Sequence, residues 1–270
     1  FVIAGTMTRA RLAEAIADPE NPLTARVMVN RIWLGHFGEG LVRTPSNFGQ
    51  MGDRPANPEI LDYLAAKFVE SGWSVKAMHR EILLSATWQQ SSAYSAKGFE
   101  VDPDNRLLWR HDRRRLDVEA LRDSMLFVSG RLDLQPVGKA IELTEENNTK
   151  RTIYGYVSRR KLEVLLGLFD FPNPVSSSEQ RIETNTPLQG LFLLNSSFVA
   201  GQAQALAERM EKEAGPDAGK RIDRVYAVLF GRPPGAEERR KGIEFLSGNP
   251  DAWPLYAQVL LSANEFLYID

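Results

Sequence analysis

Two arginines and an asparagine within an apolar segment are the first candidates for chemistry. In residues 21–38, apolar side chains occur at most positions, and Arg26, Asn30 and Arg31 interrupt them. A helix that is apolar on every face is normally buried, and a buried guanidinium is unfavourable unless a partner pairs with it. At 100° per residue, Arg26, Asn30 and Trp33 share one helix face. The segment therefore predicts carboxylates elsewhere in the chain that pair with these arginines.

Two acids of a later helical segment are the predicted partners. Glu119 and Asp123 lie four residues apart, beside apolar positions of the same pattern. We expect one of them to pair with Arg26, Arg31 or an arginine at positions 113–115. Two interpretations stay open: an internal salt-bridge network that fixes the helices, or a ligand site. The second is possible because a guanidinium binds a carboxylate or an anionic sugar in a bidentate manner.

The densest group of basic residues extends from Trp109 to Arg115 and includes Arg113 and Arg114. Basic groups beside an aromatic ring are suited to binding phosphates or acidic glycans. However, the whole chain has 33 basic and 35 acidic residues. A sequence-independent nucleic-acid binder usually has a basic excess. This balance argues against nucleic acid as a partner, and polyanion binding is the weakest of the hypotheses.

Residues for other kinds of site are sparse. His79 lies on the apolar stripe of its predicted helix, which is typical of a hydrogen-bonded core histidine, and a ligand role is the alternative. No spacing of histidines predicts a metal site, and no nucleophile elbow or nucleotide-binding loop is present. The absence of cysteine excludes disulfides, thiolate metal sites and covalently attached haem in this chain. We therefore predict no cofactor here, while carboxylate-pair hydrolysis of a polysaccharide stays open because 35 acids allow many pairs.

Helical periodicity dominates the pattern. Capping residues and proline at first-turn positions mark helix starts: Asn57 for the segment 57–70, Ser74 for the segment 75–90, and Thr186 for the apolar segment 187–194. We expect about nine or ten helices. Residues 151–158 alternate β-branched and aromatic side chains and predict a strand, with 141–143 as its partner in a small hairpin. The predicted fold class is therefore a mainly α, multi-helical array with a small β-hairpin.

The composition bounds the organisation of the chain. With 270 residues, 43% of them hydrophobic and 25% charged, it resembles an ordinary globular protein. We predict a single helical domain over residues 1–270, with two subdomains (about 1–135 and 151–270) as the alternative. No apolar stretch approaches the roughly 20 residues of a membrane span. Since the chain begins without methionine, we expect it to be part of a longer protein with its targeting signal upstream.

Ordered blocks along almost the whole chain resemble the Planctomycete-specific domain of unknown function 1553. The matching blocks are Asn21–Val27, Asn30–Trp33, Phe37–Gly38, Gly40–Val42, Asn47–Gly49, Pro58–Asp62, Ser71–Ser74, His79–Arg80, Ser85–Thr87, Gln90–Ser92, Asn105–Trp109, Arg113–Asp117, Glu119–Asp123, Phe169–Pro172, Gln189, Leu194–Ser196 and Asn264–Tyr268. One departure is Asn57, where members of the family commonly have a histidine.

The resemblance implies a C-terminal module of a large exported bacterial protein, in the periplasm or at the cell surface. Such proteins often carry a c-type cytochrome domain upstream, so that haem would belong to that domain, and their gene neighbourhoods suggest polysaccharide use. The family provides no catalytic residues to transfer. We therefore expect a non-catalytic accessory module that binds an upstream domain or a saccharide. A polysaccharide-acting enzyme with an Arg/His/carboxylate cleft is the alternative.

Overall fold

The computed structural model describes residues 8–143, 148–249 and 252–269, and its helical content confirms the predicted fold class. The described residues contain 13 α-helices, α1 to α13, and two short strands. The chain divides into two compact units, unit 1 (residues 1–114) and unit 2 (residues 115–269). The expected nine or ten helices were too few mainly because the short helices α5 and α13 were not predicted.

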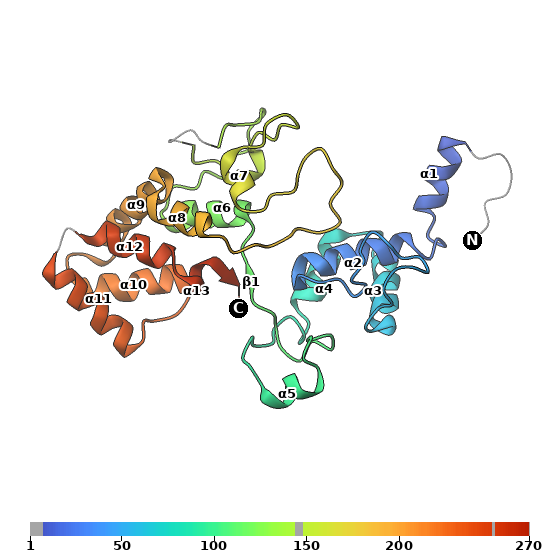
Figure 1. Cartoon of the computed structure of the whole chain (residues 1–270), viewed down its shortest axis with the longest axis horizontal. Helices are drawn as coiled ribbons and strands as arrows, with labels where there is room; N and C mark the ends of the chain where they lie inside the picture. Colours follow the sequence, from blue (N-terminus) through green and yellow to red (C-terminus); the bar gives the residue numbers. More distant parts are fainter. Residues whose placement is uncertain (1–7, 144–147, 250–251, 270) are drawn as a thin grey trace. The chain divides into compact units, whose positions relative to one another are not determined.

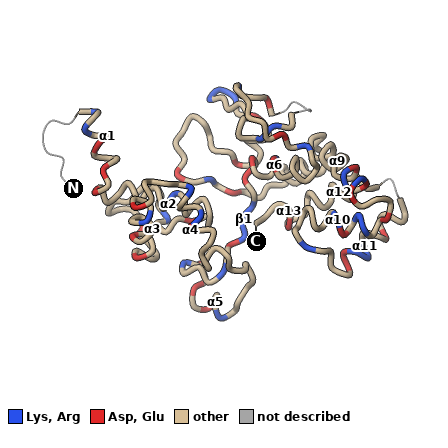
Figure 2. Tube along the Cα trace, turned by 180° about the vertical axis from the view of Figure 1, so that it is seen from behind, with Lys and Arg blue, Asp and Glu red and all other residues tan. Residues whose placement is uncertain are grey.

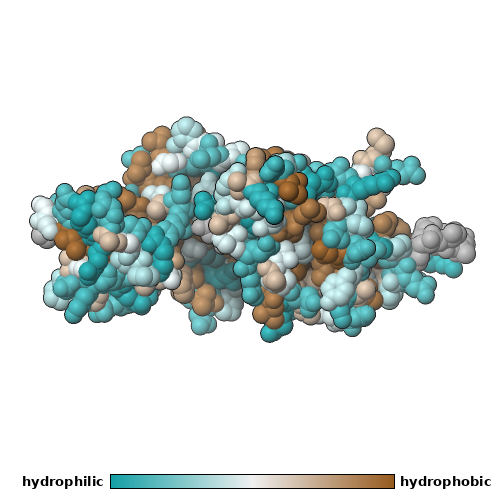
Figure 3. All heavy atoms as spheres, turned by 90° about the horizontal axis from the view of Figure 1, so that it is seen from below, coloured by the Kyte–Doolittle hydropathy of each residue, from teal (hydrophilic) through white to brown (hydrophobic). Residues whose placement is uncertain are grey.

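Charges of both signs are interspersed along both units, as Figure 2 shows, and apolar side chains reach the surface in several places (Figure 3). No helix in the described part of the chain has the length and apolar character needed to cross a membrane.

Unit 1 is built on three helices that enclose a small apolar core. Val29, Trp33 and Phe37 of α2 are buried together with Phe68 of α3 and Ile82 of α4. The predicted caps Asn57 and Ser74 accept hydrogen bonds at the starts of α3 and α4. The helices of this unit are α1 (Arg9–Ala17), α2 (Thr24–Phe37), α3 (Pro58–Glu70), α4 (Val75–Leu83) and α5 (Ala96–Val101) (Figure 1).

Asn30 is the buried polar residue of α2. Its amide nitrogen donates to the carbonyl of Val42 (3.0 Å), and its carbonyl oxygen accepts from the N–H of Val42 (2.8 Å). The residue is fully buried. Asn30 thus substitutes for a backbone partner and holds the segment after α2 against the helix.

Replacing Asn30 by alanine leaves both backbone groups of Val42 buried without a partner. We expect N30A to lower the free energy of unfolding of unit 1 by about 2–3 kcal/mol. Urea denaturation followed by tryptophan fluorescence measures this, because four of the five tryptophans lie in unit 1. The control is Q89A in the same unit, whose exposed side-chain amide donates to the carbonyl of Leu83 at 3.3 Å. Equal effects of the two substitutions would contradict the role of Asn30.

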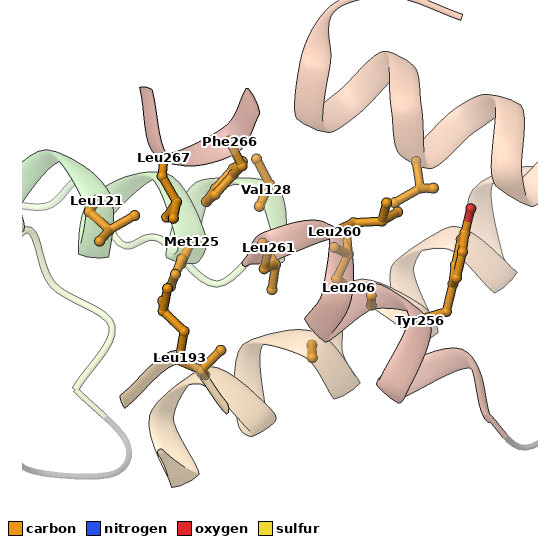
Figure 4. Close-up of a cluster of buried hydrophobic side chains, with 14 of the residues drawn as sticks. Leu121, Met125, Val128, Leu193, Leu206, Tyr256, Leu260, Leu261, Phe266 and Leu267 are labelled. Carbon is orange, nitrogen blue, oxygen red and sulfur yellow. The ribbon is translucent and has the colours of Figure 1, made fainter. Parts of the chain in front are cut away.

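Unit 2 is a larger helical array around α9 and α12. Figure 4 shows side chains of α6, α8, α9, α12 and α13 meeting in its core, among them Met125, Leu206 and Leu261, which are almost completely buried. Its helices are α6 (Val118–Val128), the 3-10 helix η1 (Thr152–Tyr154), α7 (Val164–Leu168), α8 (Pro187–Asn195), α9 (Ser197–Ala214), α10 (Ala218–Phe230), α11 (Ala236–Gly248), α12 (Trp253–Leu261) and α13 (Asn264–Leu267) (Figure 1).

The predicted strand at 151–158 was wrong. Residues 152–154 form η1, and Ile141 and Gly155 form an isolated bridge, so that only the partner segment was correct. The β propensity of this segment is overridden because Asp123 and Arg122 of α6 bind its backbone and its first side chains. The two-stranded sheet consists instead of β1 (Arg114–Arg115) and β2 (Tyr268–Ile269).

Candidate functional site

Two of the predicted acids line one cavity in unit 2. The cavity has a volume of about 470 Å³ and is called here the α6 cleft. Glu119 and Asp123 contribute one turn of α6 to it, because residues four apart lie on one helix face. The remaining lining comes from η1, its flanks, α7 and the long loop before α8. The α6 cleft is lined by Asp117, Glu119, Ala120, Asp123, Arg151, Thr152, Ile153, Gly155, Val157, Leu166, Phe171 and Arg181.

Glu119 is held by Arg181 in a bidentate pair. Both guanidinium nitrogens of Arg181 donate to its carboxylate at 2.7 Å. Burial raises the pKa of Glu119, but the hydrogen bonds and charge of Arg181 outweigh burial, so that the pKa lies below its ordinary value. Arg181 also lies over the ring of Phe171, 5.3 Å from its centroid. The carboxylate is therefore fixed in place and ionised at neutral pH.

Asp123 is held by η1. Its Oδ1 accepts from the N–H and from the hydroxyl of Thr152, both at 2.7 Å. Its Oδ2 accepts a longer bond, 3.3 Å, from Nε of Arg151, whose side chain is half-exposed. The terminal nitrogens of Arg151 have no hydrogen-bond partner among the residues that the structure describes. They are thus available as donors at the cleft.

The arginines that pair with these acids, Arg181 with Glu119 and Arg151 with Asp123, are not among the partners predicted from the sequence. Arg26 donates to Asp62 of α3 at 2.6 Å, which accounts for its position on a largely buried helix. Arg31 is exposed, because α2 has a solvent face and is not buried all round. The partners Arg151 and Arg181 lie in loops, where no periodic pattern points to them.

The basic run at 109–115 is not a continuous patch. Arg114 donates to the carbonyls of Gly35 and His36 at the end of α2, whereas Arg113 is exposed. Nε1 of Trp109 donates to the carbonyl of Asp102, and Arg110 covers the ring of Trp109 at 5.2 Å. Trp33 is buried and stacked on Phe37. Neither tryptophan therefore offers an open ring face to a sugar.

Arg115 belongs to a second polar cluster, which sequence analysis missed. It donates to Asp170 at 2.7 Å and to Gln189 at 2.8 Å. Asp170 also accepts from the N–H (2.9 Å) and the hydroxyl (2.7 Å) of Thr184. These bonds tie both ends of the loop that carries Arg181, so that the Asp170 cluster positions one side of the α6 cleft.

The three histidines of unit 1 are linked through ring contacts: His36 and His111 contact Trp88, and His79 contacts His36. Nε2 of His36 and Nδ1 of His79 are 2.8 Å apart, and the ring of His36 meets Trp88 edge-on. His111 is buried against Trp88 and Phe37, and neither of its ring nitrogens has a partner in the described part of the chain. His79 is therefore an exposed residue rather than a core residue, and it pairs with the half-buried His36. No group of three or more histidines or acids suited to a metal ion is found among the residues described.

The histidine pair predicts a pH dependence of unit 1. Burial, His79 and Arg114 lower the pKa of His36. The unfolded chain therefore binds a proton more readily, and stability that is complete above about pH 6.5 falls as the pH drops below it. Urea denaturation followed by tryptophan fluorescence measures the free energy of unfolding at each pH. Between pH 7 and pH 5, we expect this free energy to fall less for H36Q than for the wild type. Identical pH profiles would contradict this role.

Comparison with known proteins identifies one match. The family model of proteins of unknown function DUF1553 matches residues 8–246 of the 270. No curated protein and no solved structure matches the chain.

Proposed function

The chain belongs to the DUF1553 family of proteins of unknown function, and we propose that it is a non-catalytic module that binds a saccharide in the α6 cleft. The observation that carries this proposal is the set of oriented carboxylates and guanidiniums that line one cavity. Planar charged groups of this kind donate to, and accept from, neighbouring sugar hydroxyls. Their positions are fixed before a ligand arrives, which reduces the entropy lost on binding.

The charges of the α6 cleft favour a neutral saccharide. Its lining contains three acids (Asp117, Glu119 and Asp123) and two arginines (Arg151 and Arg181). This excess of negative charge repels acidic glycans and argues against the polyanion hypothesis. Ile153 beside the cleft is 69% exposed and supplies an apolar surface for the C–H face of a sugar ring.

Binding is favoured over hydrolysis because of the state of Glu119. A glycosidase needs one carboxyl group that keeps its proton near neutral pH and donates it to the leaving group. The pKa of Glu119 lies below its ordinary value since Arg181 stabilises the ionised form. Asp123 is engaged by Thr152 and Arg151, so that it serves as a hydrogen-bond acceptor of fixed geometry.

A screen of neutral and acidic oligosaccharides on an array, followed by calorimetric titration of the hits, tests this function. We expect neutral glycans to bind, R151Q to weaken binding about tenfold through loss of a charged donor, and chromatography to recover the glycan uncleaved. The matched control is R240Q, because Arg240 is also an exposed arginine paired with acids. Cleavage of the glycan, or equal binding by R151Q, would contradict the proposal.

A second candidate function is docking to a partner domain. Five apolar side chains of α8 and α12 are each more than half exposed, and Gln258 of α12 donates to the carbonyls of Leu193 and Leu194, which places the two helices in contact. Apolar surface of this kind marks interaction sites. On the family resemblance, the partner would be an upstream domain of an exported bacterial protein that also carries a cytochrome. The residues of this face are Leu188, Leu191, Leu194, Leu255 and Val259.

Pull-down with the upstream domains of a full-length family member tests the docking function. We expect the double variant L188E/L191E to lose the association and R240Q to keep it. If the double variant still binds the partner, this face is not the docking surface.

A further inference from the structure

Unit 2 contains a second cavity that is separate from the α6 cleft. It has a volume of about 460 Å³, within the range of small-molecule sites, and it is called here the α9 cavity. It is enclosed by α6, α7, the end of α8 and the start of α9, which lie next to one another in Figure 1. Its apolar lining is Leu143, Val164, Leu165, Leu168, Phe192 and Phe198.

Arg122 places a buried positive charge at this cavity. The residue is 2% exposed and forms no ion pair among the described residues, although the carboxylates of Asp123 and Glu163 act on its charge through space. It donates to the carbonyls of Asn148 (2.6 Å) and Lys150 (2.9 Å) and to the hydroxyl of Thr152 (3.2 Å), and its Nε is buried without an acceptor. A buried charge without a directly bonded carboxylate favours the approach of an anion.

Arg131 places a second guanidinium at the cavity. Within the described ranges it has neither a hydrogen-bond acceptor nor an ion pair, although the side chain is only partly exposed. It lies against Gly201 of α9, where a methyl group would be 3.7 Å from its Nη1. An arginine of this kind is free to form a bidentate pair with an incoming carboxylate.

The amino-terminal end of α9 adds to the positive potential. Ser196, Ser197 and Phe198 line the cavity, and the side chain of the cap residue Ser196 does not occupy the free N–H groups of the first turn. The positive end of a helix of 18 residues therefore faces the two arginines. Among the described residues of the lining Glu163 is the one acid, and its Oε2 already accepts from the N–H of Leu166.

We propose that the α9 cavity binds an organic monoanion: a carboxylate held by Arg131 and the first turn of α9, with an apolar body between α7 and Phe192. In the described part of the lining, two arginines and one glutamate leave one positive charge for the ligand to neutralise. The apolar side chains enclose a hydrocarbon or aromatic body. This ligand differs in chemistry from the neutral saccharide of the α6 cleft, so that the two sites are tested separately.

Titration calorimetry with octanoate, octanol and octylammonium tests the proposal on the whole chain. We expect octanoate to bind at least tenfold more tightly than octanol, and octylammonium not to bind, because one charge-assisted pair distinguishes the three head groups. R131M, which keeps the apolar stem, should reduce octanoate affinity about tenfold and leave octanol unchanged.

Two controls separate binding from folding. R131M loses no described ion pair, so that its thermal unfolding midpoint should equal that of the wild type, and R240M should bind octanoate normally. Equal affinity for octanoate and octanol, absence of octanoate binding, or unchanged octanoate binding by a folded R131M would each overturn the proposal.

Discussion

Replacement of Arg122 by alanine is expected to lower the free energy of unfolding of unit 2 by about 4 kcal/mol, the largest effect of any single substitution considered. The guanidinium is 2% exposed and supplies donors to three acceptors that flank or belong to η1. Its removal takes the donor from two partly buried carbonyls, those of Asn148 and Lys150, and leaves the hydroxyl of Thr152 with Asp123 as its partner. It also removes the cation that lies 5.2 Å from the ring centroid of Phe198.

Urea denaturation followed by far-ultraviolet circular dichroism measures this effect, and fluorescence serves as an internal reference since only Trp253 lies in unit 2. R240A is the control, because ion pairs of an exposed arginine are screened by solvent and contribute little to stability. A loss below about 1 kcal/mol for R122A would show that solvent replaces the guanidinium, and would contradict its structural role.

Replacement of Asp170 by alanine should lower the free energy of unfolding of unit 2 by about 3 kcal/mol, because four donors lose their common acceptor. These donors are Nη2 of Arg115, Nε2 of Gln189, and both the N–H and the hydroxyl of Thr184. Asp170 also has a positive φ of 63°, which asparagine tolerates better than alanine. D170N should therefore be less destabilised than D170A, and circular dichroism in urea compares them.

The same carboxylate makes a contribution to the stability of unit 2 that is lost in acid. Burial raises the pKa of Asp170, but the bonds from Thr184 and Arg115 outweigh burial and lower it. The folded state therefore favours the ionised form, and its stabilisation is present above about pH 4 and is lost as the pH falls further. Between pH 5 and pH 3, D170N should lose less stability than the wild type. A steeper loss for D170N would contradict this assignment.

Helix positions and caps could be predicted from the sequence because they depend on local patterns. Asn57 and Ser74 were expected to begin helices and do so, and the apolar segment 187–194 is helical. The strand predicted at 151–158 failed since its conformation is imposed by side chains of α6, 30 residues earlier in the case of Arg122 and Thr152. Tertiary hydrogen bonds override intrinsic β propensity in such segments.

Only part of the candidate site could be predicted from the sequence. Helical spacing placed Glu119 and Asp123 on one face, and both line the α6 cleft. Their partners Arg151 and Arg181 could not be found in the same way, since they are carried by irregular segments. Arg122 did leave a signal: it follows Val118 by four residues and precedes Leu126 by four, on a buried stripe of α6. A charged residue at such a position predicts a polar network in the core.

Mapping the binding surface by nuclear magnetic resonance tests the central claim most directly. The isotope-labelled chain is titrated with a neutral oligosaccharide from the array, and amide shifts are followed. We expect saturable shifts at Thr152, Ile153 and Gly155 that R151Q weakens, with the ligand recovered intact. Shifts confined to other surfaces of the chain, or a ligand that is cleaved, would contradict a binding module centred on the α6 cleft.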